Sequence, residues 1–260
     1  MFRTLVELGP FRIQSYGLAL ALAFLVGGVL LIRGARKKGL DEGAILNLIY
    51  VIVFSSVVGS RLMYVLTHLD DYRDDPIAVL KVWEGGLTLY GGLALAVVLS
   101  VAYMRKAGLP IWTVCDLAAP GLALGKAVTR VGCFLNGCCF GLRTELPWGV
   151  VFPYDSHAGS VFPGASLHPA QLYSSALSLV VFVILLLIGR RSRTPGVVFF
   201  SFLLMDSVVR AALGFVRYAE AGNRAFKAAG VTVSVNQVIA AVLVLISVGA
   251  LVRLRSAKAR

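Results

Sequence analysis

About seven stretches of this 260-residue chain are apolar over a length that crosses a lipid bilayer, and this feature restricts its fold more than any other. A hydrocarbon core of ~30 Å is crossed by a helix of roughly 17 to 25 residues, which pairs its backbone N–H and C=O groups within itself. The expected spans are residues 15–33, 44–66, 86–104, 111–128, 171–189, 196–213 and 233–254. We therefore expect an all-α integral membrane protein with about seven transmembrane helices.

Composition supports this interpretation and excludes a soluble globular domain. Hydrophobic residues make up 58% of the chain and charged residues only 15%, and the mean hydropathy is +0.83. The formal net charge of +12 would favour nucleic-acid binding in a soluble protein, but the Lys and Arg residues here cluster at the ends of the spans. We therefore expect membrane lipid as a partner and no nucleic acid. No small-residue cleavage site follows the first span, which we expect to remain in the protein.

The basic clusters also predict an orientation. They are Arg33, Arg36, Lys37 and Lys38; Arg105 and Lys106; Arg190, Arg191 and Arg193; and Arg253, Arg255, Lys258 and Arg260. If the spans alternate in direction, all four clusters lie on one side, which the positive-inside rule identifies as cytoplasmic. We therefore expect the N-terminus outside and the C-terminus in the cytoplasm. The acidic loop at residues 70–75 and the segment 130–170 then lie on the outer side.

The segment 130–170 is rich in glycine, proline and aromatic residues and cannot form one helix. We expect it to form a small irregular extracytoplasmic cap. Irregular backbone at membrane depth needs protein or water around it, so the glycines at 85–86, 91–92 and 132–141 are candidate cavity linings. No linker or repeat divides the chain, and residues 1–260 are expected to form a single transmembrane domain.

Three arginines, Arg61, Arg130 and Arg210, lie within or at the outer ends of apolar segments. A charged side chain costs roughly 2.5–3.5 kcal/mol there on insertion scales, so a functional role is the default interpretation. The planar guanidinium group binds a phosphate through two parallel hydrogen bonds, and converging arginines would form a lipid-phosphate site. The alternatives are that each side chain extends to the membrane surface or pairs with a carboxylate. Asp206, one helical turn before Arg210, is such a carboxylate.

Cys133, Cys138 and Cys139 are close in sequence and raise the possibility of a metal site or a disulfide. Their C-x4-C-C spacing matches none of the common zinc or iron–sulfur patterns. Packing and a disulfide from Cys133 to either later cysteine both remain open. We expect no metal and no cofactor.

His168, Gln171 and Tyr173 surround the start of the fifth span. Residues at a helix start can hydrogen-bond free backbone N–H groups or a bound anion. They are therefore candidates for substrate binding, and an ordinary helix-entry motif is the alternative.

These motifs together resemble those of the bacterial prolipoprotein diacylglyceryl transferases over nearly the whole chain. The family signature G-R-x-G-N-F-x-N-G-E-x-x-G is represented by T-R-V-G-C-F-L-N-G-C-C-F-G at residues 129–141. Further similar segments are Tyr16-Gly17, G-S-R-L-M-Y-V-L at 59–66, D-L-A-A-P at 116–120, L-P-W-G-V-V-F-P at 146–153, H-P-A-Q-L-Y at 168–173, Arg210 and Gln237.

The resemblance implies a transferase of the bacterial cytoplasmic (inner) membrane that moves diacylglycerol from phosphatidylglycerol to the signal-sequence cysteine of prolipoproteins. A thioether forms and glycerol phosphate is released. It further implies that Arg130 and Arg210 hold the donor phosphate. The other residues expected to contact the substrates are Tyr16, Arg61, Gly132, Asn136, Gly137, Gly141, His168, Gln171, Tyr173 and Gln237.

The chain departs from the family pattern at several positions. Tyr90 replaces the histidine of H-G-G, Cys133 an asparagine, Cys138 a glutamate, Asp206 a tyrosine and Ser174 a glutamate. Tyrosine has a pKa near 10 and is a poor base at neutral pH, so Tyr90 is expected to orient the substrate or to donate a hydrogen bond to the leaving group. Asp206 is expected to accept a proton or to pair with Arg210.

Two other functions are compatible with these features. The first is a divergent or inactive paralogue that binds lipid or lipoprotein. The second is a small anion or lipid transporter in which the arginines line the transport path. Against the transporter stand the absence of a clear inverted repeat and the presence of the Gly- and Pro-rich cap.

Overall fold

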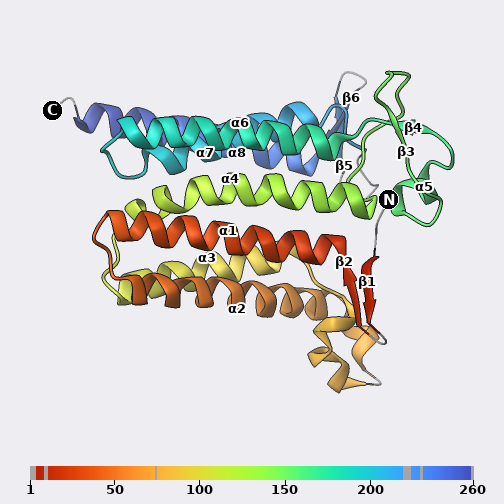
Figure 1. Ribbon diagram of the computed structural model, residues 1–260, viewed down its shortest axis with the longest axis horizontal. Coiled ribbons are helices and arrows are strands. Elements are labelled where there is room, and N and C mark those ends of the chain that lie inside the picture. Colours follow the sequence, from red (N-terminus) through yellow and green to blue (C-terminus); the bar gives the residue numbers. More distant parts are fainter. Residues whose placement is uncertain (1–3, 9–10, 74, 219–223, 229–230, 259–260) are drawn as a thin grey trace. The chain divides into compact units, whose positions relative to one another are not determined.

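The computed structural model describes residues 4–8, 11–73, 75–218, 224–228 and 231–258 (Figure 1). The chain divides into two compact units. The larger contains Met1–Leu30 and Cys115–Arg260, and the smaller contains Leu31–Val114.

Seven long helices dominate the described part of the chain. They are α1 (Ser15–Lys37), α2 (Glu42–Thr67), α3 (Leu89–Lys106), α4 (Ile111–Asn136), α6 (Ala170–Arg191), α7 (Val197–Leu213) and α8 (Val235–Lys258). Each overlaps one of the expected spans, which confirms the all-α membrane class. Six of these helices are long and apolar enough to cross a membrane. The seventh, α7, has 17 residues and carries Asp206 and Arg210.

The smaller unit is built on the close packing of α2 against α3 (Figure 1). A Cβ atom added at Gly59 would lie 2.5 Å from the carbonyl oxygen of Gly91, and one added at Gly92 would lie 2.6 Å from the carbonyl oxygen of Ser56. Small residues at such a crossing let two membrane helices approach closely. The glycines at 91–92, expected to line a cavity, instead form this helix contact. The segment of chain that connects α2 to α3 forms three short 3-10 helices, η1 (Leu69–Tyr72), η2 (Pro76–Leu80) and η3 (Val82–Glu84).

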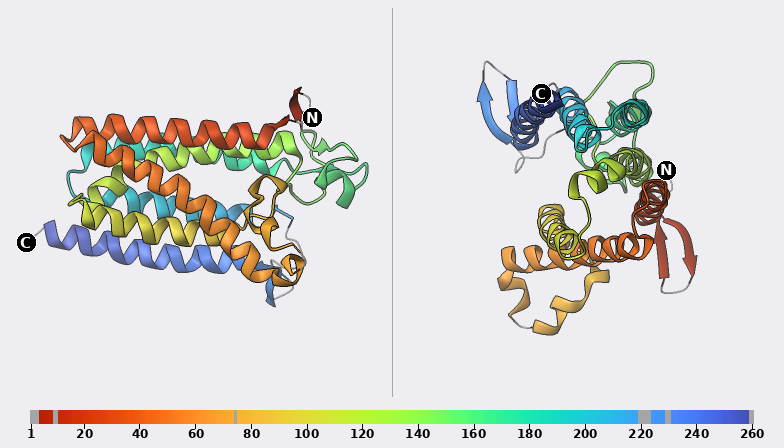
Figure 2. Two further views of the ribbon diagram at one scale, coloured as in Figure 1. Left: turned by 90° about the horizontal axis from the view of Figure 1, so that it is seen from below. Right: turned by 90° about the vertical axis from the view of Figure 1, so that its left-hand side faces the viewer.

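In the larger unit, α7 lies between α6 and α8 (Figure 2). Helix α4 packs against α6 and α7 through a core that includes Ala119, Leu185 and Phe202. Helix α1 meets α4 at glycine, because a Cβ atom added at Gly121 would lie only 3.1 Å from the Cα atom of Gly27. These contacts bring α4 and α7, the helices that carry Arg130 and Arg210, into one packed core.

A side chain of α4 caps the beginning of α7. The Asp116 carboxylate accepts hydrogen bonds from the backbone N–H groups of Gly196 at 2.7 Å and Phe199 at 2.8 Å. The first N–H groups of a helix have no partner within the helix, and a negative charge there also interacts favourably with the helix dipole. The D-L-A-A-P segment at 116–120 therefore ties α4 to α7 at the end remote from Arg130.

The expected cap is present but begins later than expected. Helix α4 continues through residues 130–136 and ends at Asn136, because the glycine and proline residues that break the helix begin only at Gly137. Beyond it the chain forms the antiparallel pair β3 (Val150–Val151) and β4 (Ser166–Leu167) and the short helix α5 (His157–Val161). Phe140, Phe152, Ala158 and Leu167 form the apolar centre of this cap.

Two β-hairpins were not expected. Strand β1 (Thr4–Leu8) pairs with β2 (Phe11–Gln14), and β5 (Arg224–Ala228) pairs with β6 (Val231–Ser234), both antiparallel. They lead into α1 and α8. A search for long apolar runs does not detect strands of four or five residues.

The two hydrogen bonds that Asp116 accepts at the start of α7 predict how its substitution changes stability. Asp116→Ala removes two hydrogen bonds to the start of α7 and is expected to cost about 2 kcal/mol, at the upper end for an N-cap. The midpoint of thermal unfolding in detergent should fall by several degrees. Asp116→Asn keeps an acceptor oxygen and should lose less. Equal midpoints for wild type and Asp116→Ala would contradict this role of the carboxylate.

Candidate active site: a basic cavity beside three cysteines

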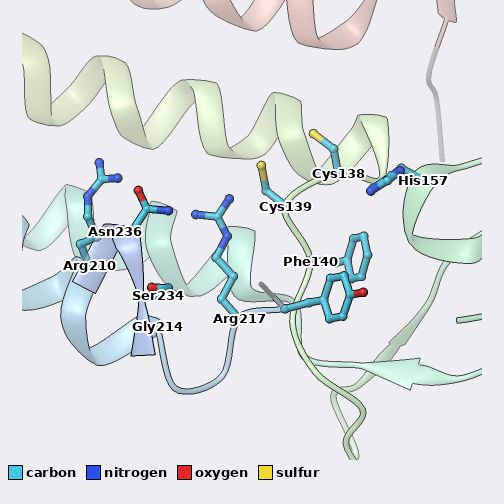
Figure 3. Close-up of a pocket in the computed structure, with 10 residues that line it drawn as sticks. Cys138, Cys139, Phe140, His157, Arg210, Gly214, Arg217, Ser234 and Asn236 are labelled. Carbon is cyan, nitrogen blue, oxygen red and sulfur yellow. The ribbon is translucent and has the colours of Figure 1, made fainter. Parts of the chain in front are cut away.

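A cavity of about 240 Å³ opens in the larger unit beside the loop that follows α7 (Figure 3). It is lined by Cys138, Cys139, Phe140, His157, Arg210, Gly214, Arg217, Tyr218, Ser234 and Asn236. A narrow recess adjoins it, lined by Lys126, Arg130, Cys139, Ala170, Ser174, Arg210, Leu213 and Arg217. The two spaces share Cys139, Arg210 and Arg217, and we refer to them together as the basic cavity.

Helices α4 and α7 each contribute residues one helical turn apart. Lys126 and Arg130 lie on α4, and Asp206 and Arg210 on α7. Lys126 and Asp206 form a close, hydrogen-bonded ion pair, whereas the nearest nitrogen of Arg210 lies 3.9 Å from the Asp206 carboxylate. The Asp206 charge is therefore engaged mainly by Lys126. The Arg210 side chain keeps 36% of its surface exposed.

Backbone pairing with the cap positions Arg217. Leu142 donates a backbone hydrogen bond to Val216 at 2.8 Å, and Tyr218 donates one to Phe140 at 3.1 Å. The rings of Phe140 and Tyr218 stack with centroids 5.4 Å apart. These backbone hydrogen bonds and this ring contact hold Arg217 beside the cysteines. Figure 3 shows the side chains of Arg210, Asn236 and Arg217 pointing the same way, with Asn236 between the two guanidinium groups.

The basic cavity carries an excess of positive charge. Lys126, Arg130, Arg210 and Arg217 provide four cations, and Asp206 provides one neighbouring carboxylate. Burying so many unbalanced charges is unfavourable in an apolar environment, so the site suits an anion that supplies the missing charge. Arginine in particular matches a phosphate.

A cluster of three cysteines adjoins the basic cavity, and two of them, Cys138 and Cys139, line it. The three sulfur atoms all lie within 4.8 Å of one another. Cys133 is buried on the last turns of α4, and Cys138 and Cys139 are half-buried in the turn that follows. The Arg130 guanidinium is hydrogen-bonded to the Cys139 sulfur. Hydrogen bonds from the Cys133 and Cys138 thiols, followed by the charges of Arg217 and Arg130, lower the pKa of the Cys139 thiol. The structure has all three as free thiols, without the disulfide that remained open.

Several other expected site residues surround this cluster. Tyr16, in the first turn of α1, interacts electrostatically with Arg130 and with the cysteines. Gln171 is buried at the start of α6, and its side-chain amide donates a 2.8 Å hydrogen bond to the carbonyl of Cys138. The side-chain oxygens of Asn136 and Gln171 are buried with no hydrogen-bond partner among the described residues. Both are polar atoms that a bound group could satisfy.

The expected glycines serve close packing. A Cβ atom at Gly132 would collide with the side chain of Ala19 on α1. One at Gly137 would lie 2.6 Å from the Cβ atom of Ser156, and Gly137 also has φ +70°. One at Gly141 would lie 2.6 Å from the carbonyl oxygen of His168. These glycines therefore position the cysteine turn.

Three further expected residues lie outside the lining of the basic cavity as the described residues define it. His168 Nδ1 is 3.4 Å from the Tyr173 hydroxyl, which also accepts a hydrogen bond from the Trp148 indole at 2.7 Å. Gln237 forms a capping box with Ser234 at the start of α8, since each side chain accepts the other's backbone N–H. Gln237 also packs against Gly214, so it supports the bend that follows α7.

Two expected residues belong to the smaller unit. Tyr90 is on the first turn of α3, with 55% of its surface exposed. Arg61 on α2 is buried, and its guanidinium group is engaged with the backbone. It donates four hydrogen bonds of 2.6–3.1 Å, to the carbonyl oxygens of Ala78, Val79, Gly85 and Gly86. It also lies over the rings of Tyr64 and Tyr72. Arg61 therefore organises the loop between α2 and α3.

Sequence reasoning missed Lys126 and Arg217. Lys126 lies inside an expected apolar span, where a charged residue is itself a functional signal. Arg217 lies beyond the end of α7, seven residues after Arg210, and its pairing with the cap brings it to the cavity. Asn236, which also lines the cavity, has no sequence signal of comparable strength.

The fold and the basic cavity define a multi-pass membrane protein whose site suits an anionic lipid headgroup. A family profile described as prolipoprotein diacylglyceryl transferase matches residues 3–253. Phosphatidylglycerol–prolipoprotein diacylglyceryl transferases are among the similar curated proteins. The relative from Geobacter sulfurreducens is 34% identical over 222 residues, covering 83% of this chain and 82% of its own. The relative from Synechococcus elongatus is 35% identical, covering 74% and 68%. The relative from Clostridium tetani is 32% identical, covering 84% and 86%.

The chain belongs to the prolipoprotein diacylglyceryl transferase family and is a transferase. This confirms the family resemblance read from the sequence motifs.

The contacts of Arg61 predict how its loop responds to substitution. Arg61→Lys keeps the charge but cannot donate hydrogen bonds in the fork geometry of a guanidinium, so the loop between α2 and α3 should open more often. We expect added protease to cleave residues 68–88 several-fold faster than in wild type. The control is Arg73→Lys, which changes an exposed ion pair with Asp70 in the same loop and should leave cleavage unchanged. Equal cleavage of all three proteins would contradict the role assigned to Arg61.

Proposed function

We propose that this protein transfers the diacylglyceryl group from phosphatidylglycerol to the signal-sequence cysteine thiol of prolipoproteins, forming a thioether and releasing glycerol phosphate. The observation that carries the proposal is that Arg130 and Arg210, from two different helices, line the same recess with Lys126 and Arg217 beside them. Such convergence fits a phosphate better than it fits isolated arginines that extend to the membrane surface.

The charges of the basic cavity suit this reaction. The phosphodiester of phosphatidylglycerol carries one negative charge, and the glycerol phosphate that leaves carries a second that develops as the C–O bond breaks. Cations already in position stabilise that new charge without reorganising, and their effect is largest where water is scarce. We assign Arg130 and Arg210 to hold the phosphate and Arg217 to stabilise the leaving group.

The acceptor thiol must become a thiolate to attack the glycerol carbon, and its ordinary pKa is near 8.5. Positive charges beside it favour the thiolate and lower that pKa. The cations that hold the phosphate therefore also assist the nucleophile. We propose that the Asp206 carboxylate pairs with Lys126 and thereby leaves Arg210 available for the phosphate. We propose that Tyr90 orients a substrate or donates a hydrogen bond to the leaving group.

The substrates fit a site in the bacterial inner membrane. Phosphatidylglycerol enters the cavity from the surrounding bilayer, and a signal peptide supplies the acceptor cysteine. Helices α1, α3 and α6 each carry two basic residues in the last turn, which supports an orientation with the N-terminus outside and the C-terminus in the cytoplasm. The cap after α4 would then be extracytoplasmic. No observation favours a transporter or an inactive paralogue.

The phosphate-binding role predicts the effect of removing each arginine. Arg130→Ala and Arg210→Ala should each lower lipidation by about a hundredfold or more, the range for losing one preorganised donor to a developing anion. The measurement is mass spectrometry of a model signal peptide incubated with purified protein and phosphatidylglycerol. Arg190→Ala is the control, since it removes an exposed arginine at the far end of α6. Near-normal activity of both cavity variants would exclude the phosphate-binding model.

The Lys126–Asp206 ion pair leads to a prediction about the activity of variants at these two positions. Lys126→Met leaves the Asp206 carboxylate free to pair with Arg210, which would draw the guanidinium away from the phosphate and lower activity about tenfold or more. The double variant Lys126→Met/Asp206→Asn removes both charges and should recover most of that loss. If Asp206 is instead the base of the reaction, the double variant will be no more active than the single one. Initial rates with the same peptide distinguish the two roles.

A further inference from the structure

We propose that Cys133, Cys138 and Cys139 bind one Zn²⁺ ion as thiolates, and that its fourth coordination position receives the acceptor thiol. The zinc site stands on the geometry of the cysteines alone. The role of the fourth position rests on the proposed transfer reaction.

The distances fit zinc. A tetrahedral Zn²⁺ with Zn–S bonds of ~2.3 Å holds its sulfur ligands about 3.8 Å apart. The three sulfur atoms already lie within 4.8 Å of one another, so small side-chain rotations complete the site. The sequence spacing matches no common zinc pattern because two ligands are adjacent. The turn at the end of α4 overcomes this by directing both of them toward Cys133.

The backbone is shaped to hold this arrangement. Cys139 has φ +60° and is the one non-glycine residue with positive φ among those described. Such a conformation is costly for a residue with a side chain and persists where the surroundings impose it. The Cys138 N–H donates to the Cys133 carbonyl at 3.1 Å, and the Gln171 amide donates to the Cys138 carbonyl at 2.8 Å. Contacts of this kind orient metal ligands.

The surrounding charges select the type of ion. Three thiolates without a metal would concentrate negative charge, whereas with Zn²⁺ they leave a single negative charge. The Arg130 guanidinium, hydrogen-bonded to Cys139, balances that charge. Soft sulfur donors select Zn²⁺ or Cu⁺ over Mg²⁺ and Ca²⁺. Cu⁺ with three thiolates would carry one more negative charge, and we therefore assign Zn²⁺.

The cluster leaves room for a fourth ligand on one side. Cys133 is buried, while Cys138 and Cys139 line the basic cavity. An ion held by all three would lie at the wall of this cavity. Catalytic zinc sites have three protein ligands and one open position of this kind.

The transfer step balances without any change of oxidation state. The acceptor R–SH gives its proton to water and binds Zn²⁺ as R–S⁻. The sulfur electron pair then forms the S–C bond to the glycerol carbon of the lipid as the C–O bond to phosphate breaks. Glycerol phosphate leaves with the electrons of that bond beside the arginines, and the neutral thioether dissociates from the metal.

Metal content tests the site independently of activity. The full-length protein, purified in detergent without chelators, should contain about one zinc per chain by elemental mass spectrometry. Cys133→Ser, Cys138→Ser and Cys139→Ser should each lose most of it. Cys115→Ser is the matched control, because it alters the fourth cysteine, on α4 but outside the cluster, and should retain zinc. Thermal unfolding in detergent identifies any variant that has lost its fold.

Cobalt substitution of the wild-type protein tests the fourth position. The Co²⁺ protein should show thiolate-to-cobalt charge-transfer absorption and the visible bands of a tetrahedral site. A signal peptide with its cysteine should change these bands, and the same peptide with serine should not. Removal of zinc should lower lipidation about tenfold at neutral pH, because the acceptor thiol is then assisted only by the cations of the basic cavity and is incompletely ionised, and zinc should restore it.

The outcomes separate the two proposals. Zinc in the protein without lipidation under any condition would overturn the transfer function and leave the metal site. Lipidation at full rate in metal-free protein would overturn the role of the ion in transfer. Stoichiometric copper, a disulfide within the cluster of anaerobically purified protein, or zinc unaffected by all three serine substitutions would overturn the zinc site itself.

Discussion

The ion pair between Lys126 and Asp206 joins the two helices on which the basic cavity depends. Either charge alone inside apolar surroundings would cost several kcal/mol, so the pair fixes α4 and α7 relative to each other in one arrangement. The pair also engages the carboxylate that would otherwise neutralise Arg210. The arginines one turn further along both helices consequently remain available for an anion. The packing of α4 against α7 and the availability of Arg210 for an anion thus depend on the same ion pair.

The cap completes the site by a different means. Residues 140–142 pair with residues 216–218 through backbone hydrogen bonds, so the segment after α4 and the segment after α7 are held together. One of these segments carries Cys139 and the other Arg217. Neither helix places these two side chains by itself. Glycines at 137 and 141 are needed because a Cβ atom at either position would lie 2.6 Å from another atom, the Cβ of Ser156 at one and the carbonyl oxygen of His168 at the other.

The sequence predicted the helices well because a membrane-spanning helix depends on local length and hydropathy. Arg130 and Arg210, which line one recess in the structure, are residues that a local rule about charge in apolar segments selects. Arg61 satisfied the same rule, and its bonds to loop carbonyls appear only in three dimensions. Arg217 and the sulfur cluster depend on a turn with positive φ and on pairing between distant segments. Periodicity and spacing contain no information about such contacts.

Arg130 contacts both parts of the proposed site, because it lines the recess and its guanidinium group is hydrogen-bonded to the Cys139 sulfur. A guanidinium group has five N–H donors in a plane, so it can serve a phosphate and a thiolate at once. In the proposed reaction the negative charge begins on the acceptor sulfur, which the proposed ion would hold beside Cys139, and ends on the phosphate. A cation that lies next to both positions stabilises the charge throughout this transfer, whereas a cation next to only one would stabilise either the reactant or the product. The proposed path of the charge therefore runs past this one residue, from the cysteine cluster to the recess.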